Sequence, residues 1–260
     1  MPELPEVESF RRKIDPQALG SPIIDVVIKE ENFLETPKDE FKKSLLNKEF
    51  ESTRRRGKNI FIKFNMKYLL LHFGMSGDVQ FYKNKRKEPK YSKVIFKFKQ
   101  NTFLSIISIR KFGKVQLIED YEKFIKKMKI GPDALEITLD EFKTIMEQKK
   151  RSFAKTALMD QSALSGIGNL YSDEVLFQSR IFPKTKISAL NEGQIEELHI
   201  NIKDILTRAL TSILTHDDYP NDFFIPYRSI DKKCPVCKSK IQRLKISSRH
   251  SFYCSTCQSK

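Results

Sequence analysis

The sequence predicts an α+β protein with a β-rich first half, a helical second half and a metal-binding segment near its C-terminal end. Short stretches of alternating apolar residues recur up to about residue 120, a pattern typical of strands. From Thr138 onward the apolar residues follow helical spacing instead. All four cysteines lie within residues 234–257. Hydrophobic residues make up 39% of the 260 residues and charged residues 31%, a balance that favours a folded chain over a disordered one.

The first half predicts an antiparallel β-sandwich with a leading helix, over residues 1–130. Val7, Phe10 and Ile14 lie on one face of a helix over Pro5–Ile14. Regularly spaced short strands then favour a sandwich. The strands are expected at Ile23–Ile28, Asn59–Phe64, Lys93–Lys99, Thr102–Ile109 and Lys114–Ile118. In the third of them the apolar side chains share one face, while Lys93, Lys97 and Lys99 are expected to form mostly a solvated opposite face.

The second half predicts a helical domain over residues 131–226. Leu190–Leu214 shows the clearest helical periodicity, and Asn191 with Gln194 three residues later matches a capping box. Pro132 and Asp133 mark a boundary between the β part and the helical part. Thr215–Lys233 then connects the last long helix to the cysteine segment.

The cysteines predict one structural Zn²⁺ in a C-terminal β-hairpin over residues 227–260. Their spacing is C-x2-C, 16 intervening residues, then C-x2-C, which places four thiolates around a tetrahedral centre. Disulfides are the alternative, but a reducing cytoplasm disfavours them. Four thiolates leave no open position for substrate, so the metal is expected to be structural. The ligands are Cys234, Cys237, Cys254 and Cys257.

The charge of the chain points to a polyanion as its partner. The formal net charge is +15 and the pI about 9.5, so counterion release at phosphates would favour binding. A lysine-rich composition without such a partner is the alternative. No apolar run reaches the roughly 18 residues of a membrane span, and the acidic start MPELPEVE is unlike a signal peptide. We therefore expect a soluble, cytoplasmic protein that binds no membrane.

The N-terminal residues offer a nucleophile beside a carboxylate. Removal of the initiator Met would expose Pro2 as a secondary amine, and N-terminal amines have pKa values near 8, so part of the population is neutral and nucleophilic. Attack on a sugar C1′ would give a cationic iminium, which acidifies the neighbouring C–H. Glu3 is placed to act as general acid or base. From the residues alone, the more common explanation is that Pro2 and Pro5 merely start a helix.

Two further segments carry weaker signals. Lys58 follows the run Arg54-Arg55-Arg56-Gly57, and a lysine after such a turn can donate a proton or bind phosphate. In 165–169 two glycines precede a helix, so backbone N–H groups can approach an anion there. The histidines show no metal-ligand spacing and are expected to be structural or exposed; they are His72, His199, His216 and His250.

Seven segments together resemble the formamidopyrimidine-DNA glycosylases, relatives of the Nei glycosylases. They are MPELPEVE at 1–8, RRRGKNIF at 54–61, HFGMSG at 72–77, IRKFG at 109–113, IGPDAL at 130–135, ALMDQSALSGIGNLYSDEVLF at 157–177 and RHSFYCSTCQ at 249–258. Their order matches the family, and they cover nearly the whole chain. The resemblance implies that the helical domain contains a helix–two-turn–helix.

The resemblance also implies roles for individual residues. Pro2 corresponds to the Schiff-base nucleophile, Glu3 to the adjacent acid/base, and Lys58 to a lysine that assists β-elimination. Arg249 corresponds to the finger arginine that binds phosphate and is linked to δ-elimination. The DNA-binding set is Asn169, with Lys150 and Lys155 as further phosphate contacts, Tyr91 at a position often occupied by histidine, and the duplex-entering trio Met75, Arg110 and Phe112. An apolar wedge and an arginine suit the gap left by a flipped nucleotide.

The chain also departs from the family pattern. Ser108 stands where the family often has Asp, Lys111 replaces a second arginine, and Tyr227-Arg228-Ser229 replaces Tyr-Gly-Arg. A Gly/Thr-rich loop that covers flipped 8-oxoguanine is not recognisable within Thr215–Lys233. These differences bear on the choice of base more than on catalysis.

The resemblance implies a bifunctional DNA glycosylase/AP lyase of base-excision repair. It would remove oxidised purines, formamidopyrimidines and 8-oxoguanine, from double-stranded damaged DNA through a Schiff base and β,δ-elimination, and act as a monomer in a bacterial cytoplasm, at the nucleoid. One alternative is a Nei-like glycosylase for oxidised pyrimidines, against which Leu4 and the Met75, Arg110 and Phe112 trio speak. A non-catalytic DNA-binding protein on the same scaffold is the other.

Overall fold

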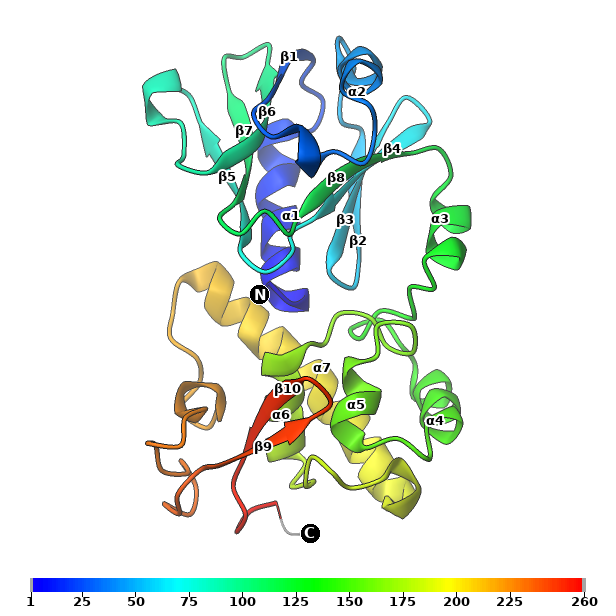
Figure 1. Ribbon diagram of the computed structural model, residues 1–260, viewed down its shortest axis with the longest axis vertical. Helices are drawn as coiled ribbons and strands as arrows, with labels where there is room; N and C mark the ends of the chain where they lie inside the picture. Colours follow the sequence, from blue (N-terminus) through cyan, green and yellow to red (C-terminus); the bar gives the residue numbers. More distant parts are fainter. Residues whose placement is uncertain (1, 259–260) are drawn as a thin grey trace. The chain divides into compact units, whose positions relative to one another are not determined.

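The computed structural model describes residues 2–258, which form two compact units (Figure 1). Unit 1 contains Pro2 and Glu6–Met128; unit 2 contains Glu3–Pro5 and the chain from Lys129 onward. Unit 1 holds the β-rich half of the sequence, and unit 2 holds the predominantly helical half with the cysteine segment. The predicted α+β class is confirmed.

Unit 1 contains two four-stranded antiparallel sheets, in agreement with the predicted antiparallel sandwich, although three of their eight strands were not among those expected. One sheet has the order β1-β6-β7-β5 and the other β2-β3-β4-β8. The strands are β1 (Ile23–Ile28), β2 (Ser52–Arg56), β3 (Asn59–Phe64), β4 (Lys67–His72), β5 (Gly77–Tyr82), β6 (Ser92–Phe98), β7 (Phe103–Ser108) and β8 (Lys114–Ile118). Short helices α2 (Lys38–Leu45) and α3 (Tyr121–Lys127) and the 3₁₀ turns η1 (Glu31–Phe33) and η2 (Lys85–Lys87) complete the unit.

The leading helix α1 (Leu4–Ala18) extends four residues beyond its predicted end. Its residues Val7, Phe10 and Ile14 are buried in one cluster with side chains from both sheets, such as Phe96 and Ile62. The spacing of these residues on one helix face therefore places α1 in the sandwich core, where Figure 1 shows it in dark blue.

Lys93 departs from the expected solvated lysine face, because its side chain is only 8% exposed. The pairing of β6 with β7 shifts register between Ser92 and Val94. A bulge of this kind interrupts the alternation of side chains and re-aims a residue. The expectation for Lys93 was wrong, whereas Lys99 is exposed as expected.

Unit 2 is built around helix α6, whose residues Tyr171–Phe177 are all buried. A helix without an exposed face belongs at the centre of a unit. Its helices are α4 (Leu139–Gln148), α5 (Ala154–Met159), α6 (Asn169–Gln178) and α7 (Glu192–Thr215), with the 3₁₀ turns η3 (Ile187–Ala189) and η4 (Ile225–Tyr227). The predicted capping box is confirmed, because Asn191 and Gln194 bond each other's backbone at the start of α7.

The cysteine segment contains the two-stranded hairpin β9 (Gln242–Ile246) and β10 (Arg249–Tyr253). Strand β10 packs on α6, and Figure 1 shows the hairpin in orange and red over that helix. Within residues 2–258, no helix combines the length and the apolar character needed to cross a bilayer.

Candidate functional site

Glu3 is fixed by the start of helix α6. Its side chain is only 2% exposed, and its carboxylate accepts hydrogen bonds from the backbone N–H groups of Gly168 at 2.6 Å, Leu170 at 2.8 Å and Tyr171 at 3.3 Å. Free N–H groups at a helix N-terminus attract a negative charge. Pro2 precedes Glu3 directly and is half-buried.

The turn before α6 requires glycine. Gly166 has φ of +117°, and a Cβ on it would lie 2.5 Å from the Leu4 side chain. Its N–H donates to Gln161 Oε1 at 3.1 Å, and its carbonyl accepts from Leu4 N at 3.1 Å. The sequence predicted that an anion meets backbone N–H groups here; in the structure that anion is the carboxylate of Glu3.

Lys58 lies in the turn between β2 and β3, which an ionic cluster holds against α1. Glu8 on α1 accepts hydrogen bonds from Arg11 at 2.7 Å and from Arg55 at 3.2 Å, and Arg55 Nη1 donates to the carbonyl of Gly57 at 3.1 Å. Burial alone would raise the pKa of Glu8, but the hydrogen bonds and charges of Arg11, Arg12 and Arg55 hold it down at about 2. The chain of contacts therefore runs from α1 to the residue before Lys58.

His72 at the end of β4 is a second titratable group near this turn. Burial is the main cause that lowers its pKa, and the charges of Lys114 and Lys58 lower it further. Its Nδ1 accepts a hydrogen bond from Gly74 N at 3.3 Å. Both causes favour the neutral imidazole beside Lys58, which the isolated position of His72 in the sequence did not indicate.

The loops that follow β4 and β7 bring Met75, Arg110 and Phe112 onto adjoining loops of unit 1. A Cβ on Gly74 would lie 2.4 Å from the backbone of Phe112, and the N–H of Arg110 donates to Ser76 Oγ at 2.9 Å. All three side chains of the trio are exposed, Phe112 to 63%. Together with Met75 and Ile109, Phe112 places three exposed apolar side chains on these two loops, and such groups are typical of interaction surfaces.

Tyr91 lies beside the second of these loops. It is exposed, its φ is +67°, and its carbonyl accepts from Ser108 N at 3.2 Å. The ammonium of Lys90 lies 5.1 Å from the centre of its ring. Tyr91, just before β6, and Arg110, just after β7, therefore lie at the same end of these two paired strands.

Lys155 is not on the surface, where a phosphate contact was expected. Its side chain is 1% exposed, and its ammonium bonds the carboxylate of Asp173 and, at 3.0 Å, the carbonyl of Asn169. Burial is the main cause that lowers its pKa. This burial argues against direct phosphate contact and favours a role in holding α6. Asn169 itself begins α6, with a buried Oδ1 that has no hydrogen-bond partner within residues 2–258.

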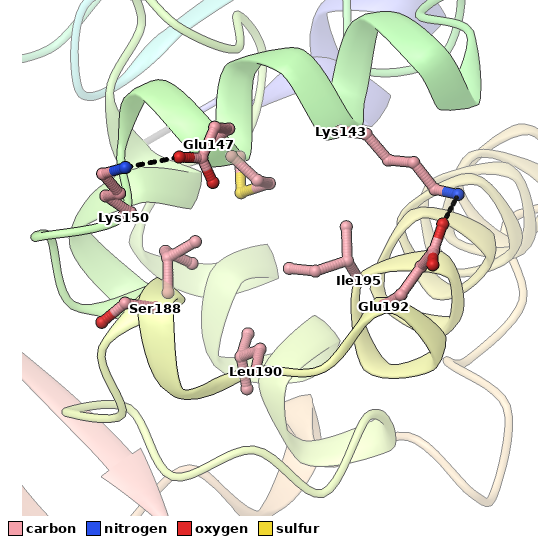
Figure 2. A pocket seen from close by; sticks show the side chains of 9 residues that line it. Lys143, Glu147, Lys150, Ser188, Leu190, Glu192 and Ile195 are labelled. Atoms are coloured by element: carbon pink, nitrogen blue, oxygen red, sulfur yellow. Dashed lines mark hydrogen bonds and ion pairs between the residues drawn. The ribbon is translucent and has the colours of Figure 1, made fainter.

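Lys150 is exposed and pairs with Glu147 at 2.6 Å. It lies at one end of a pocket of about 280 Å³ between α4, η3 and α7, as Figure 2 shows. Met146, Ile187, Leu190 and Ile195 form its apolar part, and Lys143 bonds Glu192 at 2.7 Å at the other end. The charged groups are paired with each other, so the pocket offers no catalytic group.

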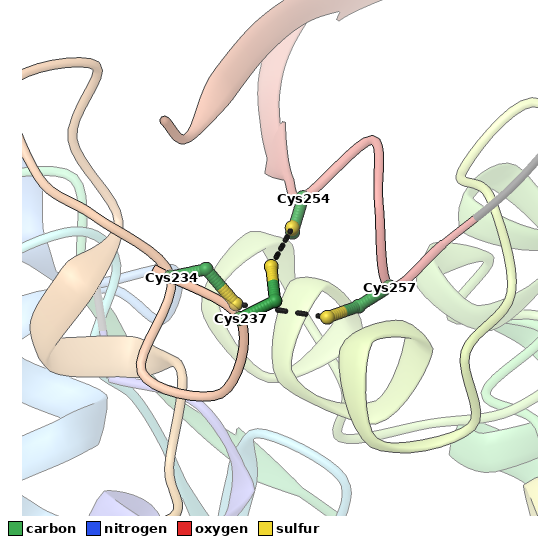
Figure 3. Close-up of side chains that lie close together, drawn as sticks. All are labelled: Cys234, Cys237, Cys254 and Cys257. Atoms are coloured by element: carbon green, nitrogen blue, oxygen red, sulfur yellow. Dashed lines mark hydrogen bonds between the residues drawn. The ribbon is translucent and has the colours of Figure 1, made fainter. Parts of the chain in front are cut away.

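The four cysteines converge as a metal centre requires (Figure 3). All four sulfur atoms lie within 4.8 Å of one another, with Cys234 and Cys257 at 3.7 Å and Cys237 and Cys254 at 3.3 Å. A tetrahedron of Zn–S bonds near 2.3 Å has edges of roughly 3.8 Å, so the donor set fits one structural Zn²⁺.

Arg249 is the first residue of β10 in the cysteine segment. Its side chain is exposed and reaches Met159 on α5, with Nη1 4.0 Å from the sulfur. Lys155, Met159, Ser248 and Arg249 are among the residues that line a pocket of about 270 Å³. The zinc segment therefore places an unshielded guanidinium at the rim of a pocket in unit 2.

Sequence reasoning missed Asp173, a fully buried carboxylate at the centre of unit 2. It bonds Lys155 on α5, accepts from Ser251 Oγ at 2.6 Å and Phe252 N at 3.1 Å on β10, and pairs with Arg228. A buried acid needs such partners. No local pattern signals it, because its partners lie up to 79 residues away.

The two sheets, the helical unit and the four-cysteine hairpin, with Pro-Glu at the N-terminus, define a zinc-finger DNA glycosylase. Three family models match in order: the formamidopyrimidine-DNA glycosylase N-terminal domain over residues 1–115, the corresponding H2TH domain over 130–217, and a zinc finger found in FPG and IleRS over 231–260.

Curated relatives and solved structures agree with these matches. The formamidopyrimidine-DNA glycosylase of Listeria monocytogenes is 30% identical over 99% of this chain and 100% of its own length, and that of Proteus mirabilis is 33% identical over 99% and 98%. The Lactococcus lactis Fpg in complex with abasic-site DNA has a TM-score of 0.91 at 28% identity, covering 99% and 100% of the two chains. Its complex with FAPY-dG DNA gives 0.90 at 29%, with the same coverage.

The chain belongs to the formamidopyrimidine-DNA glycosylase family. The predicted family and zinc centre are thereby confirmed. The named relatives are bacterial.

Proposed function

We propose that this protein is a bifunctional DNA glycosylase and AP lyase that removes oxidised purines from duplex DNA. One observation carries the proposal: Pro2 precedes a carboxylate that three backbone N–H groups, that of Gly168 and the two of Leu170 and Tyr171 in α6, hold in place. A positioned acid beside an amine is the pair that imine chemistry needs. The relatives' names and their complexes with damaged DNA support the same activity.

The chemistry follows from these two residues. Once Met1 is removed, the Pro2 nitrogen attacks C1′, and the C1′–N bond to the damaged base breaks, its electron pair leaving with the base. Glu3 protonates the sugar ring oxygen, the ring opens, and the amine loses its proton to give a C1′ iminium. That cation is an electron sink, so a base removes a C2′ proton and the 3′ phosphate leaves. We assign Lys58 to assist this β-elimination and Arg249 to the following δ-elimination.

Unit 2 would bind the DNA backbone through Asn169, Lys150 and Arg249. In unit 1, Met75, Arg110 and Phe112 would fill the gap left by the flipped nucleotide, with Tyr91 as a neighbouring contact. The exposure of Phe112 on a braced loop supports this, because a wedge must be apolar, accessible and rigid.

Borohydride trapping tests the nucleophile. A duplex with an abasic site should become covalently attached to the protein, because borohydride reduces the iminium to a stable amine. Pro2→Gly or an N-terminal extension should suppress the adduct, whereas Lys13→Ala, a change on an exposed position of α1, should leave it unchanged. Efficient trapping with a blocked N-terminus would rule out Pro2.

The choice of lesion depends on the connector over residues 215–233. Phe223 and Phe224 are buried, and Glu174 holds the N–H groups of Phe224 at 3.0 Å and Ile225 at 2.7 Å. Tyr219 bonds Tyr171 through their hydroxyls at 3.2 Å. These contacts leave few residues of the connector to cover a flipped base. Fewer hydrogen-bond donors would then be available to recognise 8-oxoguanine.

We therefore propose that ring-opened formamidopyrimidines are released faster than 8-oxoguanine, since their damage already weakens pairing and stacking. Single-turnover rates on matched duplexes with each lesion opposite cytosine test this. Equal rates would show that the connector does not determine the preference, and faster release of oxidised pyrimidines would favour a Nei-like specificity.

We also propose that the protein acts as a monomer in the bacterial cytoplasm, at the nucleoid. Its proposed domains are the catalytic sandwich over 1–130, the helix–two-turn–helix domain over 131–226 and the zinc finger over 227–260.

A further inference from the structure

Arg228 lies where α6 meets the zinc hairpin. Its Nε and Nη2 donate to Asp173 Oδ2 at 2.9 and 2.6 Å, and Nη2 also reaches the carbonyl of Asn169 at 3.3 Å. The guanidinium carbon stands 5.2 Å from the ring centre of Phe252 on β10. These contacts fix the plane and the direction of the guanidinium.

One edge of this guanidinium remains available. Within residues 2–258, Nη1 of Arg228 has no hydrogen-bond partner, although Nε and Nη2 are both bonded. The side chain is 14% exposed, and Nη1 is not among the buried polar atoms that lack a partner. Solvent therefore reaches the one nitrogen that the protein leaves unused.

The positive charge of Arg228 is only partly neutralised by its surroundings, so it can still attract an anion. Asp173 is shared with a second cation, Lys155, so one carboxylate serves two positive charges. The carbonyl of Asn169 is bonded by both Lys155 and Arg228. The free edge thus lies close to the residue that the proposed function assigns to a backbone phosphate.

We propose that Arg228 is an additional phosphate-binding residue of the DNA-binding surface, clamped by Asp173 so that Nη1 donates to a phosphate next to the one bound by Asn169. The inference rests on the proposed function. The Tyr-Gly-Arg sequence typical of the family has glycine at this position, so the contact would be particular to chains with arginine here. Arginine suits the role, because a held guanidinium loses little entropy when it binds phosphate.

The salt dependence of DNA binding tests this assignment. We would titrate an abasic-site duplex with the wild type, Arg228→Gln and the matched control Arg208→Gln at several salt concentrations. Arg208 also pairs with carboxylates, Asp204 and Asp222, but on α7. Arg228→Gln should weaken binding about ten- to hundredfold, as loss of a charged hydrogen bond does, and lower the slope of log K against log salt by about 0.9, the value for one phosphate. Arg208→Gln should alter neither.

Each outcome is decisive. Weaker binding of Arg228→Gln with an unchanged salt slope would show that Arg228 only holds α6 and the hairpin together. An equal loss of slope in Arg208→Gln would show that the effect comes from the change in net charge. Either result overturns the proposal. Should Arg228→Gln lose zinc or fail to fold, Arg228→Gly, the residue of the family pattern, takes its place with the same expected slope. A wild type that binds no duplex would refute the proposed function itself, whereas a binding wild type with an unaffected variant would refute this inference alone.

Discussion

The two units hold their functional side chains by different means. In unit 1 the turn that carries Lys58 is tied to α1 by the Glu8 and arginine cluster, and both rest on a large sandwich core. In unit 2 the zinc hairpin has a small apolar cluster, in which Cys234 and Cys254 lie with Phe177, Phe224 and Ile241. So small a core needs further links, which the metal and Asp173 supply. The turn that we propose to be catalytic therefore depends on ion pairs, and the hairpin that we propose to bind DNA depends on a metal.

Two buried carboxylates show the same contrast in charge. Glu8 has a pKa of about 2 because its partners are arginines, whereas burial raises the pKa of Glu174 to about 7, since its partners are neutral N–H groups. Both side chains are buried. The charge of the hydrogen-bond partners, more than burial, decides whether the pKa of each carboxylate is raised or lowered.

Removal of zinc is the largest expected perturbation. Chelation or Cys237→Ser should unfold the hairpin, because structural zinc contributes about 10 kcal/mol or more to the folding of such small units. Arg249 would then be displaced, and duplex binding should fall at least a hundredfold. Unit 1 should stay folded, which limited proteolysis with metal analysis would show. A zinc-free protein that binds duplex DNA with undiminished affinity would show that the hairpin does not depend on the metal, contrary to the contrast between the two units.

Glu8→Gln should cost about 3 to 5 kcal/mol, the usual loss when one partner of a buried ion pair is removed, and should slow the lyase step by displacing Lys58. Denaturant melts and trapping rates measure the two effects. The matched control is Glu51→Gln, whose partner Lys63 is exposed; that change should leave the stability nearly unchanged, because an exposed ion pair contributes little. A similar loss of stability in both variants would show that the ion pairs of Glu8 contribute no more than an exposed ion pair does.

The pH dependence of stability should have opposite signs for the two carboxylates. The Glu8 contribution is present above pH 4.5 and is lost as the pH falls toward about 2. Glu174 acts in the reverse sense: its contribution is greatest below pH 4.5 and is lost as the pH rises through about 7. Each amounts to at most about 3 kcal/mol. Melts of Glu174→Gln from pH 5 to 8 should lack the decline that the wild type shows; an unchanged decline would exclude Glu174 as its source.

Phe112→Ala should have the smallest effect on stability, less than about 0.5 kcal/mol, because the ring is 63% exposed. Binding of an abasic-site duplex should nevertheless weaken, since the wedge is lost. Leu46→Ala, at another exposed apolar position of unit 1, is the control and should change neither quantity much. A stability loss of several kcal/mol in Phe112→Ala would show that this loop is held by packing.

Local patterns predicted the elements of this fold well. Strands β1, β3 and β8 have the bounds that the alternation predicted, and the capping box at Asn191 formed as expected. The cysteine spacing likewise predicted the cluster. In each case the signal and its physical cause lie within a few residues of one another.

Contacts between distant residues were not predictable in this way. Lys155 was expected to contact phosphate because of the family resemblance, but its side chain is buried and its ammonium bonds Asp173 and Asn169. The sequence identified Tyr227-Arg228-Ser229 only as a departure from the Tyr-Gly-Arg sequence of the family. The pairing of Arg228 with Asp173 joins positions 55 residues apart and was not predicted. Periodicity predicts which face of a helix or strand is buried. It does not predict which charged residues from distant parts of the chain pack against that face.

The glycine turn at 165–168 has a consequence for how the protein tolerates mutation. Its backbone contacts Leu4 and orients the first amides of α6, and those amides hold the carboxylate of Glu3. A side chain at Gly166 would push directly on the residue next to Glu3. Because we propose Glu3 as the acid/base, we expect variation in this turn to be limited by catalysis as well as by folding. A variant with a side chain at Gly166 would then fold and keep its metal site but lose activity.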